Sequence, residues 1–172
     1  MSFSAPVQLD RKHALTGFDC SHSGLNEWLI RHAMQSQSAG SAKTFVVLEG
    51  ATLAGYFSLT VGQIDSVEAP DRIRQGMGRY PIPVVILARM AVAVQYQGLG
   101  IGKGMLQDAI RRTLLISEQA GIRALLTHPI DAKAAKFYLQ FGFLKSPILE
   151  GQLILLLKDA RFLLDPSPRT KS

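Results

Sequence analysis

The chain is 172 residues long, and its composition, 47% hydrophobic and 19% charged, is typical of a folded globular protein rather than a disordered one. No apolar run reaches the roughly 18–20 residues of a membrane helix, and the first residues lack a signal-peptide core, so we expect a cytoplasmic protein with no membrane partner. A single cysteine, Cys20, excludes an intrachain disulfide, and four scattered histidines argue against a metal site.

The first 61 residues predict a short strand, a helix and a hairpin. The expected elements are a strand near residues 7–9, a helix from Ser23, and strands over 44–48 and 53–61. In the helix, four residues recur at the spacing of one face: Leu25, Trp28, Leu29 and His32. This pattern favours Trp28 as a core residue over a wall of an acceptor pocket, and His32 as a packed or capped histidine over a base.

Residues 62–83 form the longest irregular stretch of the sequence, and connections of this length are more often functional than accidental. One helical turn is expected at 71–76. Pro81 and Pro83 then precede a central apolar strand that starts at Ile86.

Basic residues are in excess only in the second half of the chain, with twelve Lys or Arg against six Asp or Glu in residues 81–172. Part of this excess is a solvated C-terminal tail that contains Lys158, Arg161, Arg169 and Lys171. The remainder, together with three arginines of the long connection, predicts a surface for a polyanion. The three arginines are Arg72, Arg74 and Arg79.

Four glycines alternate after the central strand: Gly98, Gly100, Gly102 and Gly104. Each costs about 0.5–1 kcal/mol relative to alanine inside a helix, so a functional reason is needed. A tight strand-to-helix turn supplies one, because its backbone N–H groups and the helix N-terminus bind phosphate. The Walker A and G-x-G-x-x-G patterns both fail here. The letters over 95–100 match Q-x-x-G-x-G, and a loop that merely turns a corner is the alternative.

The rest of the chain predicts a helix that ends at Gly121, a strand over 123–127, a helix over 131–140 and a final strand over 153–157. Arg111 and Arg112 project from the first helix, where a solvated face is slightly favoured over substrate contact. The sequence has no internal repeat and no low-complexity linker, so we expect one domain over residues 1–172.

Two motifs resemble those of the GNAT N-acetyltransferases. Q-x-x-G-x-G after a strand is similar to their acetyl-coenzyme A loop. Residues 131–143 resemble the family pattern N-x-x-A-x-x-x-Y-x-x-x-G-F, with Asp131 in place of Asn and Tyr138 as the tyrosine near the thioester sulfur. Longer stretches, among them PVVILARMAV and FYLQFGF, look like the GNAT toxins of type II toxin–antitoxin modules, the TacT and AtaT type.

The resemblance implies an α/β (α+β) GNAT fold with a central mixed, mostly antiparallel sheet that is splayed at the acetyl-CoA site and flanked by helices. It makes acetyl-CoA the cosubstrate, with residues 90–94 as the splayed strand and a backbone N–H of Ala91 or Val92 polarising the thioester carbonyl. The residues expected at the cofactor are Met90, Ala91, Val92, Gln97, Gly98, Leu99, Gly100, Gly102, Lys103, Asp131 and Phe137.

Tyr138 would protonate the leaving thiolate or hold the sulfur in place, since a neutral phenol can donate to a developing thiolate. The alternative is a packed aromatic residue, because Phe137, Phe141 and Phe143 surround it in the sequence. No Glu or His base is paired with it, which suits an α-amine acceptor with a pKa of about 7.7–8.0 better than a lysine. Arg89, in an apolar strand, either reaches an edge or meets a phosphate or carboxylate.

The toxin resemblance implies acetylation of the α-amino group of aminoacyl-tRNA, a ribbon-helix-helix antitoxin as partner, operator DNA bound only through the antitoxin complex, and a homodimer. The residues expected to meet the substrate are Trp28, Arg72, Arg74, Arg79 and Arg89. Two alternatives stay open: a GNAT enzyme for a small molecule or peptide, and a non-catalytic acetyl-CoA-binding regulator.

Overall fold

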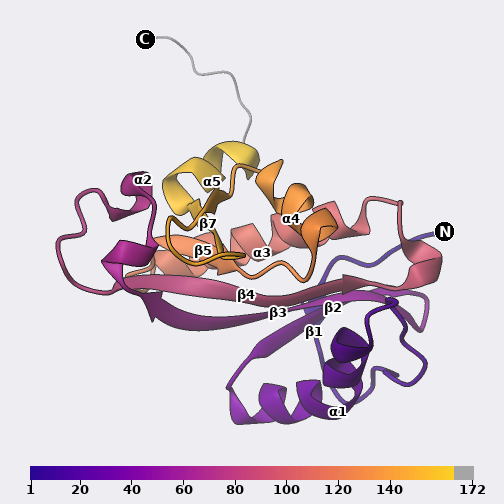
Figure 1. Cartoon of the computed structure of the whole chain (residues 1–172). Helices are drawn as coiled ribbons and strands as arrows, with labels where there is room; N and C mark the ends of the chain where they lie inside the picture. The colour runs from indigo at the N-terminus through magenta and orange to yellow at the C-terminus, as the bar shows by residue number, and fades with distance from the viewer. Residues whose placement is uncertain (165–172) are drawn as a thin grey trace, which may run out of the picture. The chain divides into compact units, whose positions relative to one another are not determined.

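The computed structural model describes residues 1–164, and the chain divides into two compact units. The first comprises Met1–Thr60 and Leu87–Ala109, and the second comprises Val61–Ile86 and the chain from Ile110 onward. Seven strands are hydrogen-bonded in the order β1-β2-β3-β4-β5-β7-β6 (Figure 1). Strands β3 (Thr52–Ile64) and β4 (Ile82–Val92) contribute residues to both units.

The mixed α/β class and the mostly antiparallel sheet predicted from the sequence are confirmed. The pairs β1–β2, β2–β3, β5–β7 and β6–β7 are all antiparallel. Helices flank the strands (Figure 1). The expectation of one domain over the whole chain stays a prediction.

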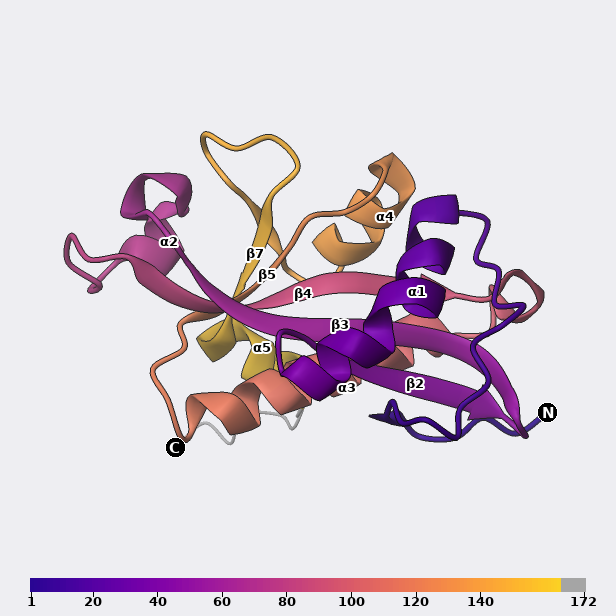
Figure 2. The same ribbon diagram turned by 90° about the horizontal axis from the view of Figure 1, so that it is seen from below.

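In the first unit, helix α1 (Ser23–Ala39) lies against β2 (Lys43–Glu49) (Figure 2). Strand β1 (Val7–Gln8) pairs with β2 along the edge that does not pair with β3. The helix ends where Gly40 adopts a φ of 78°, which lets its N–H donate to Ser36 O at 2.9 Å. The predicted strand, helix and hairpin of this region are confirmed within three residues at each end.

The buried face of α1 differs from the predicted one. Leu29, Ala33 and Gln37 are its buried residues, whereas His32 is exposed and Trp28 is only partly buried. Gln37 tolerates burial because its Oε1 accepts the Thr44 N–H at 2.7 Å. The expectations of a packed His32 and a core Trp28 were therefore wrong. Apolar periodicity counts only hydrophobic residues, so it could not identify the polar Gln37, which is buried because it is hydrogen-bonded to β2.

The second unit contains the long connection, with a 3-10 turn η1 (Ser66–Glu68) and the predicted helical turn α2 (Asp71–Arg74). It also contains the second half of helix α3 (Ile101–Ser117), from Ile110 onward, and a C-terminal group of elements. These are β5 (Ala124–Thr127), α4 (Ala132–Leu139), β6 (Leu144–Lys145), β7 (Leu153–Leu156) and α5 (Leu157–Leu164). Every residue of β5 and β7 is buried, and these two strands form the centre of the core of this unit.

Two predicted boundaries, the start of β4 and the end of α3, were wrong. Pro83 lies inside β4, where it takes part only as an acceptor, from Arg123 N at 2.8 Å. Helix α3 ends at Ser117, before Gly121, because the Ser117 hydroxyl donates to Leu114 O and the following N–H groups turn back on the last helical carbonyls.

The predicted solvated tail begins instead with a helix. Leu157, assigned to the final strand, opens α5, which also holds Lys158 and Arg161. Arg169 and Lys171 lie outside the described residues. Among residues 1–164, no helix is both long and apolar enough to cross a membrane, and no cluster of His, Cys, Asp and Glu is placed to hold a metal ion.

Candidate functional site

The glycine loop of the first unit follows the end of β4. The strand stops at Val92, so the predicted extension of the splayed strand to Val94 was wrong: Val94–Tyr96 forms a 3-10 turn, η2. Ala93 N still donates to Ala54 O at 2.8 Å, which keeps the chain on β3 up to that residue. The Gln97 side chain then closes the turn by donating from Nε2 to Val92 O at 3.0 Å.

Two glycines of the loop are required by backbone conformation. Gly98 has a φ of 79° and Gly100 a φ of 84°, a left-handed region that costs other residues about 1–2 kcal/mol. A Cβ at either position would meet no atom within 4 Å, so the loop is open rather than crowded. Gln97, Leu99 and both glycines are exposed to solvent.

Helix α3 begins directly after the loop, at Ile101, so Gly102 and Lys103 belong to its first turn. Gly104 N donates to Gly100 O at 3.1 Å, the first bond of the helix. The N–H groups before Gly104 have no acceptor within the helix and point out of its positive end. An exposed turn with these donors and the exposed Lys103 fits the pyrophosphate of acetyl-CoA.

The end of β4 packs tightly against β3 in the same unit. Ala91 is 7% exposed, while Met90 and Val92 are partly buried. A Cβ on Gly55 would lie 3.0 Å from Ala91 O and 3.0 Å from the end of the Met105 side chain. Gly55 was not singled out by the sequence reasoning, although an isolated glycine inside a strand does signal close backbone approach.

Tyr138 lies in the second unit, on α4, and is 5% exposed. Its ring makes edge contacts with Phe137 and Phe143, at centroid distances of 5.2 and 5.3 Å. Burial raises the pKa of the Tyr138 phenol to about 12, against a smaller lowering by a hydrogen bond with the Thr127 side chain. The phenol is therefore neutral at physiological pH. Tyr138 is thus a packed aromatic residue that also keeps a neutral hydroxyl, so the structure is compatible with both interpretations of the sequence.

Asp131 has a structural task at the start of α4. Its Oδ1 accepts the Ala134 N–H at 2.8 Å, which caps the helix. An asparagine would supply the same cap through its side-chain oxygen, so the difference from the family pattern leaves the start of this helix intact. Phe137, the other expected cofactor residue of α4, is partly buried against Tyr138 and Phe141.

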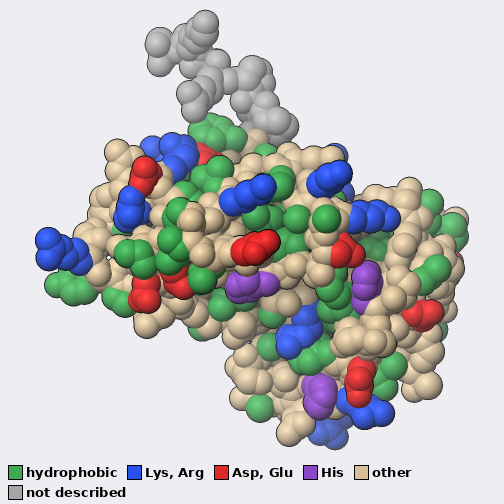
Figure 3. Space-filling view, in the orientation of Figure 1, with side chains coloured by type: hydrophobic (Ala, Val, Ile, Leu, Met, Phe, Trp, Pro, Cys, Tyr) green, Lys and Arg blue, Asp and Glu red, His purple; other side chains and the backbone are tan. Residues whose placement is uncertain are grey.

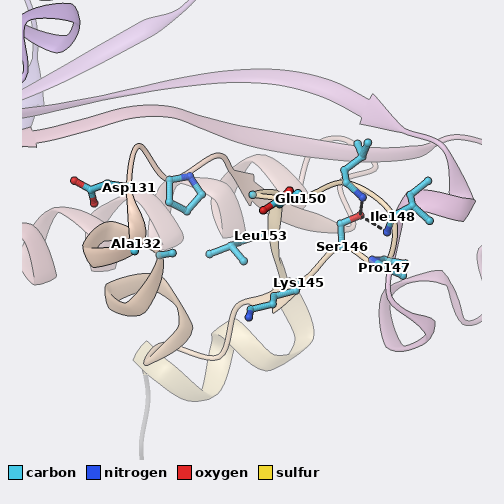
Figure 4. Close-up of a pocket in the computed structure, with 12 residues that line it drawn as sticks. Asp131, Ala132, Lys145, Ser146, Pro147, Ile148, Glu150 and Leu153 are labelled. Atoms are coloured by element: carbon cyan, nitrogen blue, oxygen red, sulfur yellow. Dashed lines mark hydrogen bonds between the residues drawn. The ribbon is translucent and has the colours of Figure 1, made fainter.

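A cavity of about 580 Å³ opens between the start of α4 and the β6–β7 connection (Figure 4). Its lining is largely apolar, with charged groups at Asp131, Lys145 and Glu150. Ser146 fixes the connection, since its Oγ donates to Glu68 O at 2.7 Å and accepts the Leu149 N–H at 3.1 Å. No sequence motif covers residues 145–151, so sequence reasoning missed this cavity.

The arginines predicted to form a polyanion surface differ in what they contact. Arg72 donates to both oxygens of Asp159, from Nε at 2.7 Å and also from Nη2, and Arg74 is ion-paired with Asp71. Arg79 is exposed and has no ion-pair partner among residues 1–164. On the face drawn in Figure 3, Lys and Arg side chains alternate with Asp, Glu and His instead of forming one patch.

Arg89 and Trp28, the two remaining substrate candidates, are brought together in the first unit. The Arg89 guanidinium carbon lies 3.8 Å from the centre of the Trp28 ring. Both side chains are partly buried, and burial lowers the pKa of Arg89. The glycine loop belongs to the first unit and Tyr138 to the second.

Comparison with known proteins decides the family. A model of the acetyltransferase (GNAT) domain matches residues 40–145. The tRNA-acetylating toxin of Mycobacterium tuberculosis is 34% identical over 162 residues, which cover 94% of this chain and 97% of that protein. The chain belongs to the GNAT acetyltransferase family. The resemblance predicted from the two motifs is thus confirmed, and the GNAT domain is an acetyl-CoA-dependent acyltransferase.

Solved structures agree with the GNAT fold. AtaT complexed with acetyl-methionyl-tRNAfMet matches with a TM-score of 0.85 and 24% identity, covering 94% of this chain and 99% of that one. A tyrosine-to-phenylalanine mutant of AtaT, bound to the C-terminus of the antitoxin AtaR and acetyl-CoA, matches with a TM-score of 0.79 and 23% identity over 95% and 98% of the chains. At these identities the two likenesses show the fold of the acetyltransferase.

Proposed function

We propose that this GNAT enzyme transfers an acetyl group from acetyl-CoA to the α-amino group of aminoacyl-tRNA and so blocks translation. The observation that supports this substrate best is the 34% identity with a tRNA-acetylating toxin, which extends over nearly the full length of both proteins. The AtaT complex with an acetylated aminoacyl-tRNA has the same fold.

The residues of the glycine loop would hold the cofactor through backbone N–H groups. Gln97, Gly98, Leu99, Gly100 and Gly102 would surround the pyrophosphate, with Lys103 beside it. Met90, Ala91 and Val92 would line the pantetheine arm, where an N–H of Ala91 or Val92 donates to the carbonyl oxygen that gains negative charge. Bound acetyl-CoA supplies the acetyl group as a thioester.

Tyr138 would act by donating a hydrogen bond to the sulfur. A phenol with a pKa of about 12 is a weaker acid than a thiol with a pKa near 8.5, so complete proton transfer to a free thiolate is unfavourable. A neutral donor that stabilises negative charge on sulfur needs no such transfer. Of the two roles expected from the sequence, the raised pKa supports the one that holds the sulfur in place.

The acceptor chemistry needs little help from a base. An α-amine has a pKa of about 7.7–8.0, so a large fraction is neutral and nucleophilic at pH 7 to 8. The enzyme then contributes mainly by orienting the two reactants. As partners of such a toxin we propose a ribbon-helix-helix antitoxin, operator DNA reached only through the antitoxin complex, and a second copy of the chain in a homodimer that acts in the cytoplasm.

The test is transfer of labelled acetyl from acetyl-CoA to a total pool of aminoacylated tRNA, beside uncharged tRNA and free amino acids. Label on charged tRNA alone, released by mild alkaline hydrolysis as N-acetyl amino acid, is the expected result. Label on free amines with none on RNA would assign the enzyme to small-molecule or peptide acetylation. Cofactor binding without any transfer would indicate a regulator.

A further inference from the structure

Arg89 is an unusual cation in the first unit. It lies on β4 within an apolar strand, and its side chain is partly buried. Within residues 1–164 its guanidinium makes no hydrogen bond or ion pair, and it lies over the face of Trp28 at 3.8 Å from the ring centre. Taking a guanidinium partly out of water without an anionic partner costs free energy, so this position calls for an explanation.

Two other arginines of the chain have the carboxylate partner that Arg89 lacks. Arg31, on α1, donates from Nη1 to Glu27 Oε1 at 3.0 Å, and Arg72 contacts both oxygens of Asp159. These two side chains are largely exposed, at 70% and 53%, yet each has a carboxylate. Arg89, which is less exposed than either, has none. Arg89 is therefore partly buried without the carboxylate that these two more exposed arginines have.

The Trp28 ring lies against the guanidinium of Arg89, whose central carbon is 3.8 Å from the ring centre. Trp28 is itself stacked on Tyr56, with ring planes 13° apart and centroids 6.2 Å apart. Tyr56 is fully buried, and its hydroxyl donates to Leu25 O at 2.7 Å, which ties the stack back to α1. Stacking uses one face of a guanidinium and leaves its in-plane N–H donors available for an oxyanion.

We propose that Arg89, oriented by Trp28, binds a phosphate group of the RNA acceptor end. This assignment rests on the proposed function. An arginine fork fits carboxylates and phosphates alike. In an aminoacyl-tRNA, however, the carboxyl group of the amino acid is esterified to the ribose, so phosphate is the anion that this substrate offers. Arg89 thereby becomes a substrate-binding residue and Trp28 a positioning residue.

Trp28 is the single tryptophan of the chain, which gives a direct measurement of binding. We would titrate the protein, without acetyl-CoA, with a short RNA hairpin that ends in CCA and follow tryptophan fluorescence. A saturable change is expected for the wild type. Arg89→Gln should weaken binding by about 10- to 100-fold, the value of a hydrogen bond to a charged group. It should also reduce the dependence of log Kd on log salt by roughly 0.7–0.9.

Arg31→Gln is the matched control, because Arg31 lies three residues from Trp28 on α1 but is exposed and paired with Glu27. It should bind RNA like the wild type. Arg89→Lys keeps the charge without the planar fork and should recover part of the affinity. Thermal melting of each variant shows that the fold is retained. In steady state, Arg89→Gln should raise KM for charged tRNA and leave KM for acetyl-CoA unchanged.

The outcomes separate this proposal from the proposed function. Wild-type affinity and salt dependence in Arg89→Gln would overturn the phosphate site, even with acetyl transfer to tRNA intact. A fluorescence response to coenzyme A that depends on Arg89, with no response to RNA, would show that Arg89 binds a phosphate of the cofactor. That result would also overturn the RNA phosphate site. If RNA binds as expected while no acetyl reaches charged tRNA, the phosphate site stands and the acceptor assignment fails.

Discussion

The glycine loop after β4 and the aromatic group around Tyr138 carry the two family motifs, yet they are built in opposite ways. The loop is open: Gly98 and Gly100 have no atom near the place of a Cβ, and the groups offered to a ligand are backbone N–H donors. Tyr138 is enclosed at 5% exposure, and the group it offers is one hydroxyl. A backbone site depends on conformation, whereas a side-chain site depends on packing.

The largest effect is expected at the hydroxyl. Tyr138→Phe keeps the ring contacts with Phe137 and Phe143 but removes the donor to the sulfur, so kcat for acetyl transfer should fall about 100-fold. The unfolding midpoint should change little. Affinity for acetyl-CoA, measured by calorimetry, serves as the control and should stay within a few-fold of the wild type. A mutant with full kcat would show that Tyr138 is only a packed aromatic residue.

The loop should respond through conformation. Gly98→Val combined with Gly100→Val places side chains in left-handed backbone at a cost of about 1–2 kcal/mol each. The loop is then expected to rearrange and to bind acetyl-CoA at least about tenfold more weakly. Gly121→Ala is the matched control, because that glycine also has open space but no positive φ. Unchanged affinity in the double mutant would remove the phosphate site from this loop.

Burial of Tyr138 also predicts a pH dependence of stability. The raised pKa leaves the phenol protonated in the folded state when the unfolded chain, with a pKa near 10, has begun to lose the proton. The contribution of the protonated Tyr138 phenol to the free energy of unfolding is complete below pH 10 and is lost as the pH rises towards about 12.

Denaturant titrations between pH 10 and 12 should therefore give a falling free energy of unfolding, part of it from Tyr56, whose pKa burial also raises. In Tyr138→Phe the slope should be less steep by up to about 1.4 kcal/mol per pH unit. Identical slopes in mutant and wild type would mean that Tyr138 titrates as a solvated phenol.

The cap of α4 offers a smaller test of the enclosed region. Asp131→Ala should lower the free energy of unfolding by about 1 kcal/mol, because the Ala134 N–H loses its acceptor. Asp131→Asn should restore most of this loss. If the alanine and asparagine variants bind acetyl-CoA equally well, Asp131 serves only as a helix cap. If only the asparagine variant recovers the affinity for acetyl-CoA, the side chain at this position contacts the cofactor.

The smallest effect is expected from Lys103, the charged side chain in the first turn of α3 after the loop. Lys103 is exposed, and an exposed charge contributes at most about 1 kcal/mol, so Lys103→Gln should raise Kd for acetyl-CoA no more than about fivefold. The salt dependence of binding should decrease slightly. A loss greater than that of the double glycine mutant would show that the side chain, and not the backbone, makes the main contact.

Sequence reasoning reached the elements whose signals are local. The predicted strands, the turn at α2 and the helix with Tyr138 agree with the structure to within a few residues, because strand alternation, glycine and capping residues act on neighbouring backbone, whereas the short strand β6 was not predicted. It failed at Pro83, at the end of α3 and at the start of α5, where a hydrogen bond to another element or a serine hydroxyl decides the boundary. The β6–β7 connection, which forms one wall of the cavity, carried no motif.

The sequence by itself determined the local structure of the two motifs, since a left-handed turn demands glycine and Asp131 caps the helix that carries Tyr138. Only the tertiary structure decided the state of the charged and aromatic groups. Arg72 meets Asp159, Arg89 lies on Trp28, and the Tyr138 phenol is buried beside Thr127. These contacts join residues far apart in the chain, so their energies depend on packing that no local pattern records.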